Sequence, residues 1–278
     1  MPYVDVNGCK LWYELKGSGD YLLQIGGAGF SHENFGFVTD AMAEHFTVID
    51  TDLRGYGFSD RPVQKYTMEV WADDCAVLLD GIGVERAHVH GTSMGGMVAI
   101  KFAAKYPEKV DGLVIDCASA KSDFMCRARF EIWKDIAKAY GMGSRTLALE
   151  LATQATSRAF RDTPRGPEII PVIQGVLERN TSVEIFCAAC DAMIEMDLEA
   201  DLPKIKAPTI VMDGDQDILT PLDQGPQGIG NRAIAEAIPN AELYVIEGVG
   251  HTNLMEAPVL STEVVVGFLD RVGSQAAV

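Results

Sequence analysis

One five-residue stretch, residues 91–95 (GTSMG), constrains the fold of this chain more than any other. It lies between a β-like run at 87–90 and a helical run from about 96 to 106, so it predicts a strand–turn–helix junction. A serine on so tight a turn needs small residues two positions to either side, because the backbone folds back on itself there. The pattern makes Ser93 a candidate nucleophile, with a helix N-terminus behind it. The same pattern also occurs by chance in many chains.

Runs typical of strands and helices alternate on both sides of this junction. The alternation predicts a mostly parallel sheet with right-handed crossovers and helices on both faces. Near the N-terminus, Asn7-Gly8 between two β-like runs predicts an antiparallel hairpin. The further strand-like runs are 21–25, 46–50, 110–116, 209–213 and 241–246, and the helical runs include 37–44 and 68–79.

The strand pattern disappears between residues 119 and 202 and resumes after them. We therefore expect an α/β core made of residues 1–118 and 203–278, with residues 119–202 inserted as a helical cap. Such an insertion would fold over the carboxyl edge of the sheet, where ligands bind in these folds. Trp133, Met125 and Phe186 are candidates to shape an apolar pocket. The arginines of the insertion are expected at the surface; they are Arg127, Arg129, Arg145, Arg158 and Arg161.

The charge and the cysteines limit the classes of partner. A net charge of −17 argues against nucleic acid or an anionic membrane surface, since both would be repelled. No apolar run is long enough to span a membrane and no signal-peptide pattern begins the chain, so we expect a soluble, cytoplasmic protein. The six cysteines show no framework spacing and are expected to be reduced. Among them, Cys187 and Cys190 form a C-x-x-C pattern that is interpreted as buried thiols.

Two Gly-rich loops follow predicted strands. Residues 26–29 (GGAG) come directly after the run 21–25, and a backbone N–H near Gly27 and Ala28 could form half of an oxyanion hole. An ordinary strand–helix turn is the alternative. The second loop contains Asp52 and Arg54, which are expected to pair with each other or to cap backbone groups.

The acids and histidine that serine chemistry needs occur later in the chain. Asp213, Asp215 and Asp217 follow one predicted strand, and His251 lies on a Gly-rich loop after the last strand. The calcium-loop pattern fails there, so one of these acids is better interpreted as the partner of a histidine. The order Ser, Asp, His is the one associated with the G-x-S-x-G turn. Met94, the residue after the serine, would offer its N–H to a developing oxyanion.

These motifs, in this order, resemble the α/β-hydrolase superfamily, and specifically its cap-bearing esterase, lactonase and C–C hydrolase branch. The resemblance implies a triad of Ser93, Asp217 and His251, because the family's acid is normally the last carboxylate of the G-x-x-D turn. Some relatives take the acid from the end of the preceding core strand, where Asp116 stands. The resemblance covers nearly the whole chain and rests on residues 26–29, 52–59, 91–96, 201–208, 214–217 and 250–251.

The chain departs from the family pattern at two places. Members commonly have His-Gly where this chain has Gly26-Gly27, so the oxyanion loop is expected to differ in shape. Relatives that cleave carbon–carbon bonds often carry Asn before the nucleophile and Trp soon after the histidine. Here those places hold Thr92 and residues 252–254 (TNL), which favours ester or lactone chemistry. A serine at the turn also argues against a dehalogenase or epoxide hydrolase.

We therefore expect a serine hydrolase that cleaves a small carboxylic ester or lactone through an acyl-enzyme, with no cofactor and no metal. Ser93 would attack, His251 would act as base and then acid, and Asp217 would orient His251. Within enzymes the alternatives are hydrolysis of a carbon–carbon bond in a meta-cleavage product or diketone, and perhydrolysis. A non-catalytic small-molecule receptor on this scaffold is the alternative of another class. A homodimer is left open.

Overall fold

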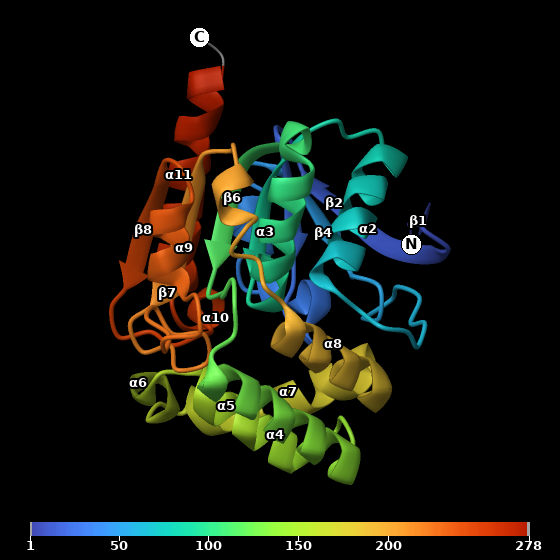
Figure 1. The fold of residues 1–278 in the computed structure, drawn as a ribbon, viewed down its shortest axis with the longest axis vertical. Coiled ribbons are helices and arrows are strands. Elements are labelled where there is room, and N and C mark those ends of the chain that lie inside the picture. Colours follow the sequence, from blue (N-terminus) through green and yellow to red (C-terminus); the bar gives the residue numbers. More distant parts are fainter. Residues whose placement is uncertain (1, 277–278) are drawn as a thin grey trace.

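The computed structural model describes residues 2–276 and contains an eight-stranded sheet in the order β1-β2-β4-β3-β5-β6-β7-β8 (Figure 1). Strand β2 is antiparallel to both of its neighbours, and every pair from β4 to β8 is parallel. The mostly parallel sheet expected from the sequence is confirmed. The strands are β1 (Tyr3–Val6), β2 (Cys9–Gly17), β3 (Tyr21–Ile25), β4 (Thr47–Thr51), β5 (Ala87–Thr92), β6 (Val110–Asp116), β7 (Thr209–Gly214) and β8 (Ala241–Ile246).

The predicted N-terminal hairpin is also confirmed. Val6 pairs with Cys9, so Asn7 and Gly8 form a two-residue connection. Their φ angles are 46° and 81°, and positive φ at both central residues is the requirement of the tight turn that matches the twist of paired strands.

Alternate residues of the central strands face opposite sides of the sheet, which gives the core two apolar layers. Leu22, Val48 and Val114 belong to the layer covered by α1 and α11, and Leu23 and Ile49 belong to the layer covered by α2 and α3. The helices of the core are α1 (Thr39–Met42), α2 (Met68–Gly81), α3 (Met94–Lys105), α9 (Asn231–Ala237), α10 (Asn253–Glu256) and α11 (Pro258–Ala276), with short 3₁₀ turns η1 (Ser31–Phe35), η2 (Pro107–Lys109) and η3 (Leu202–Lys204).

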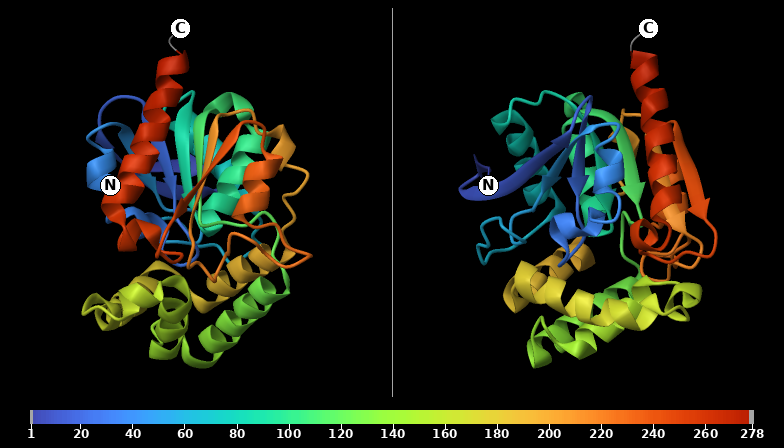
Figure 2. Two further views of the ribbon diagram at one scale, coloured as in Figure 1. Left: turned by 90° about the vertical axis from the view of Figure 1, so that its left-hand side faces the viewer. Right: turned by 180° about the vertical axis from the view of Figure 1, so that it is seen from behind.

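Five helices within residues 119–202 gather at one end of the sheet, and the three views agree on this arrangement (Figures 1 and 2). Four of them start at residues whose side-chain oxygen accepts a backbone N–H three positions on: Asp123, Ser144, Ser157 and Ser182. Such caps satisfy N–H groups that a helix start leaves unpaired. The helices are α4 (Phe124–Tyr140), α5 (Arg145–Ala155), α6 (Arg158–Arg161), α7 (Arg165–Asn180) and α8 (Val183–Glu195).

The loop after β4 differs from the sequence-based expectation. Arg54 does not pair with Asp52; it donates to both oxygens of buried Asp74 at 2.7 and 2.8 Å. Asp52 accepts from the backbone N–H of Phe58 and lies 2.6 Å from the ring of His32. The capping interpretation of Asp52 is therefore correct, and the pairing is wrong because α2 brings a nearer carboxylate to Arg54.

Two further expectations concern the thiols and the helices. All six cysteines are free and buried, Cys187 and Cys190 among them, as interpreted from the sequence. Helix α1 is shorter than the helical run that the sequence predicted at 37–44. Helix α3 begins two residues before the predicted start at 96, directly after Ser93. Within residues 2–276, no helix combines the length and the apolar character needed to cross a membrane.

Candidate active site

Ser93 lies on the sharp turn between β5 and α3. Its φ and ψ are 56° and −123°, a conformation that costs free energy for a residue with a side chain. A Cβ on Gly91 would lie 2.3 Å from the carbonyl oxygen of Gly95, and a Cβ on Gly95 would lie 1.9 Å from that of Ile25. Only glycine fits at these two positions, which explains the spacing seen in the sequence. Although Ser93 is the N-cap of α3, its hydroxyl makes no capping bond, so it is not committed to the helix.

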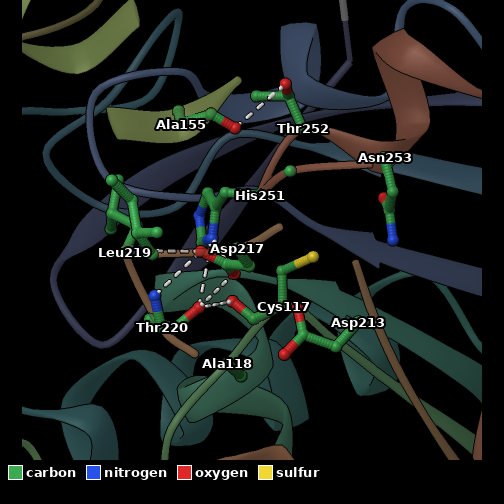
Figure 3. A network of polar contacts seen from close by, with 12 residues as sticks. Cys117, Ala118, Ala155, Asp213, Asp217, Leu219, Thr220, His251, Thr252 and Asn253 are labelled. Carbon is green, nitrogen blue, oxygen red and sulfur yellow. Dashed lines mark hydrogen bonds and ion pairs between the residues drawn. The ribbon is translucent and has the colours of Figure 1, made fainter. Parts of the chain in front are cut away.

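His251 and Asp217 form a buried pair at the carboxyl ends of β8 and β7. Nδ1 of His251 lies 2.8 Å from Oδ2 of Asp217 (Figure 3). The other oxygen, Oδ1, accepts the backbone N–H groups of Leu219 and Thr220 at 2.6 and 3.0 Å. The Thr220 hydroxyl lies 2.9 Å from Oδ2 and 3.1 Å from the imidazole Nδ1. These contacts fix the carboxylate in one orientation and aim one imidazole nitrogen at it.

The electrostatics of the pair favour charge on both members. Burial alone would raise the pKa of Asp217, but the neighbouring His251 charge and the N–H donors hold its pKa below the ordinary value. Burial alone would lower the pKa of His251, but the Asp217 carboxylate raises it above 6.5. An imidazolium formed at His251 is therefore stabilised by an ionised partner.

Asp213 is a second carboxyl beside this pair, at the end of β7. Burial and then the Asp217 charge raise its pKa well above the ordinary value, which favours its neutral form. Its Oδ2 accepts the amide of Asn231 at 2.8 Å. Asp215 accepts the N–H of Gly248 at the surface. Of the three acids in this loop, Asp217 alone contacts His251 among the described residues.

Asp116, the other candidate acid, is fully buried but engages different partners. Its Oδ1 accepts the side-chain amide of Asn253, and its Oδ2 is 3.8 Å from Nε2 of His90. Its backbone carbonyl accepts the N–H of Ser93 at 2.8 Å. Asp116 thus supports the turn from behind, and it is Asp217 that the structure brings to His251.

The backbone donors near Ser93 are not equivalent. Gly27 lies against Ser93, since a Cβ on it would be 3.1 Å from Cβ of Ser93. Its N–H, however, donates to Oδ1 of Asn34 at 2.6 Å. Of the two loop residues predicted from the sequence, Ala28 therefore remains as the candidate donor beside Met94. Asn34 was not predicted, because nothing in the sequence pattern shows that its side chain turns back to the loop.

One cavity of about 130 Å³ contains Ser93 and His251 in its lining, together with Gly27, Ala28 and Asn34. Trp133, one of the three pocket candidates named from the sequence, also lines it. Met125 and Phe186 do not: Met125 is 59% exposed on the outer side of α4, and Phe186 is fully buried. The Phe186 ring stacks on Trp133 at a centroid distance of 6.3 Å, so it supports the wall from behind.

A thiol, a carboxylate and an imidazole also lie close enough together to be compared with a metal site. Ligand atoms of Cys117, Asp217 and His251 are within 4.8 Å of one another. Burial raises the pKa of the Cys117 thiol well above its ordinary value, which keeps it protonated. A metal needs the thiolate, so this trio is poorly suited to hold one.

Comparison with known proteins shows which family this fold resembles. The family model of the alpha/beta hydrolase fold matches residues 22–147. An enol-lactonase from Burkholderia xenovorans superposes with a TM-score of 0.86 and 26% identity, covering 97% of this chain and 100% of that one. A thermophilic esterase from Thermogutta terrifontis gives 0.85 and 27%, covering 98% of both chains.

Sequence comparison agrees with the structural one. The 3-oxoadipate enol-lactonase 2 of Acinetobacter baylyi is 27% identical over 217 residues, which are 77% of this chain and 75% of that protein. The fold class predicted from the sequence is confirmed by these matches and by the sheet order. The chain therefore has the α/β-hydrolase fold, is a hydrolase, and is similar in this comparison to the esterase and lactonase branch of that superfamily.

Proposed function

We propose that the protein hydrolyses a small carboxylic ester or lactone through an acyl-enzyme on Ser93, His251 and Asp217. The observation that carries the proposal is the buried Asp217–His251 pair, 2.8 Å apart, whose imidazole shares a cavity with Ser93. A serine hydroxyl is too weakly acidic to attack unaided, so it needs a base in the same cavity. Two of the similar structures are an enol-lactonase and an esterase, which supports this reaction class.

In the acylation step, Oγ of Ser93 forms a bond to the substrate carbonyl carbon while Nε2 of His251 takes the hydroxyl proton. Nδ1–H of His251 donates to Asp217, which fixes this tautomer and stabilises the imidazolium. The N–H groups of Met94 and Ala28 donate to the oxyanion as it forms. Collapse of the tetrahedral intermediate breaks the carbon–oxygen bond, and His251 returns the proton to the leaving alkoxide.

In the deacylation step, His251 takes a proton from water, the resulting hydroxide attacks the acyl-enzyme, and Ser93 leaves with the proton that His251 returns. An ester releases its alcohol before this step. A lactone keeps the alcohol tethered to the acyl group until a hydroxy acid is released.

A fluorophosphonate probe tests the proposal, with the adduct located by mass spectrometry and turnover of aryl esters and simple lactones measured in parallel. We expect the adduct on Ser93 and turnover that disappears in Ser93→Ala. Absence of both labelling and turnover would contradict a serine hydrolase and favour a binding protein. Labelling accompanied by turnover of vinylogous diketones alone would favour the carbon–carbon bond hydrolase instead.

A further inference from the structure

We infer that the substrate is uncharged: the site takes an ester or lactone with an apolar body and discriminates against one that carries a free carboxylate. This inference rests on the proposed function, because it specifies what Ser93 attacks. It is carried by the chemistry of the cavity wall and by the positions of the surrounding cations.

The cap supplies two apolar helix faces to the cavity. Residues of α7 at spacings of three and four line it, and α5 contributes a shorter stripe of the same kind. Val172 is 52% exposed, as is Phe37 of the core, so these two side chains lie at the mouth. The α7 stripe is Ile169, Val172, Ile173 and Val176, and the α5 stripe is Leu151, Ala152 and Ala155.

The lining contains no lysine or arginine among the described residues, and its only ionisable members are His251 and Glu33. Glu33 is already paired: one carboxylate oxygen accepts from Arg179, and the other accepts from Asn180 at 2.6 Å. A cationic substrate would therefore have to displace Arg179. Among the described residues, the lining therefore offers no unpaired charge of either sign to a substrate, since the imidazole of His251 is itself paired with Asp217.

Besides Arg179, two further arginines stand behind lining residues, and both are committed to other partners. Arg129 donates to the carbonyl oxygen of Leu219 at 3.0 Å. Arg165 lies 5.1 Å over the ring of Phe160 and donates to the carbonyl of Met255 at 3.4 Å. Neither side chain lines the cavity. A carboxylate in the cavity would lose its hydration without gaining a cation in exchange, which is unfavourable.

The test compares three aryl esters that share a six-carbon acyl chain: 4-nitrophenyl hexanoate, mono-4-nitrophenyl adipate, and the adipate with its free carboxyl methylated. We expect kcat/KM for the free acid to be at least about 100-fold below that for hexanoate, because an unpaired charge is costly to bury. The methylated ester should lie within about 10-fold of hexanoate. Equal rates for hexanoate and the free acid would overturn the inference, as would equal rejection of both adipates.

Measurements at high salt distinguish an effect of the cavity wall from an effect of the protein's net charge of −17. Long-range repulsion is screened at high ionic strength, whereas loss of hydration inside a cavity is not. We expect the ratio of kcat/KM for hexanoate to that for the free acid to be about the same at 0.5 M NaCl as at low salt. If the discrimination against the free acid disappeared at high salt, its cause would be the overall charge of the protein, and the assignment to the cavity wall would be overturned.

A cation placed at the mouth should relax the discrimination. Val172→Lys puts an ammonium at a half-exposed lining position. It should raise the ratio of kcat/KM for the free acid to kcat/KM for hexanoate about 10-fold. Val63→Lys is the control, since Val63 is 75% exposed and does not line the cavity. An equal effect of both variants would contradict the inference. If no ester is turned over faster than by Ser93→Ala, the proposed function itself fails. Failure of the proposed function is thus distinguishable from failure of this inference, in which esters are turned over without the expected discrimination.

Discussion

The α/β core and the helices α4–α8 within residues 119–202, which we refer to as the cap, contribute different kinds of group to the same cavity. The core provides Ser93, His251 and the loop from Gly27 to Asn34, each held by a turn at a strand end. The cap provides helix faces that are apolar apart from Thr156. A turn that only glycine fits tolerates little change, whereas an apolar helix face can be repacked. Substitutions in the core should therefore change the rate or the folding, and substitutions in the cap should change substrate binding.

The largest effect is expected where the core orients its base. Asp217→Asn keeps the shape of the side chain but removes the charge that stabilises the imidazolium, so kcat should fall about 10⁴-fold. Asp213→Asn is the matched control, since burial and the Asp217 charge already favour the neutral form of the Asp213 carboxyl. It should change kcat less than about threefold, on the same reasoning. Comparable losses in the two variants would break the assignment of Asp217.

The next effect concerns folding of the turn. In Gly95→Ala, the new Cβ would meet the carbonyl of Ile25 at 1.9 Å, and we expect the free energy of unfolding to fall by about 3 kcal/mol. Gly267→Ala lies in the exposed face of α11 with nothing within 4 Å of the added Cβ. It should raise the free energy of unfolding by up to about 1 kcal/mol. Urea unfolding of both variants would measure the contrast, and similar values would show that the turn is not sterically restricted.

Local rules explain why much of the core could be predicted. The glycine spacing around Ser93 and the order of Asp217 and His251 at strand ends can be read along the chain. Contacts between residues that are far apart in the sequence could not be predicted in this way. The bond from Gly27 to Asn34 depends on how one loop folds back, and the Arg54–Asp74 pair depends on where α2 packs.

The cap shows the same limit more strongly. The sequence identified Trp133, Met125 and Phe186 as apolar candidates for the pocket, but it did not show which neighbour each side chain meets. Trp133 lines the cavity, while Phe186 lies behind it and Met125 faces outward. The α7 stripe, from Ile169 to Val176, has a clear periodicity, yet only the packed structure shows that it lines the same cavity as Ser93.

Within the cap, a smaller effect on binding is expected. Ile173→Ala shortens a buried side chain of the wall and should raise KM for 4-nitrophenyl hexanoate about 10-fold with kcat within about twofold. Ile132→Ala is the control, because Ile132 is on α4, is 47% exposed and does not line the cavity. A fall in kcat with unchanged KM for Ile173→Ala would contradict the division between core and cap.

The smallest effect is a shift along the pH axis. His251 must be neutral to act as base, and the Asp217 charge raises its pKa, so kcat/KM should fall as pH decreases through a value above 6.5. Removing that charge leaves burial dominant, which lowers the pKa. In a Ser93→Ala background, an NMR titration of the His251 ring should therefore move to below pH 6.5 when Asp217→Asn is added.

The same shifts define a stability window. The raised pKa of His251 contributes stability that is complete below pH 6.5 and is lost as pH rises through the raised value. The depressed pKa of Asp217 contributes stability that is complete above pH 3.8 and is lost as pH falls through the depressed value. The pair should therefore stabilise the fold most between pH 3.8 and 6.5. If Asp217→Asn reduced the free energy of unfolding by the same amount at pH 5 and at pH 9, the pair would not be charged as described.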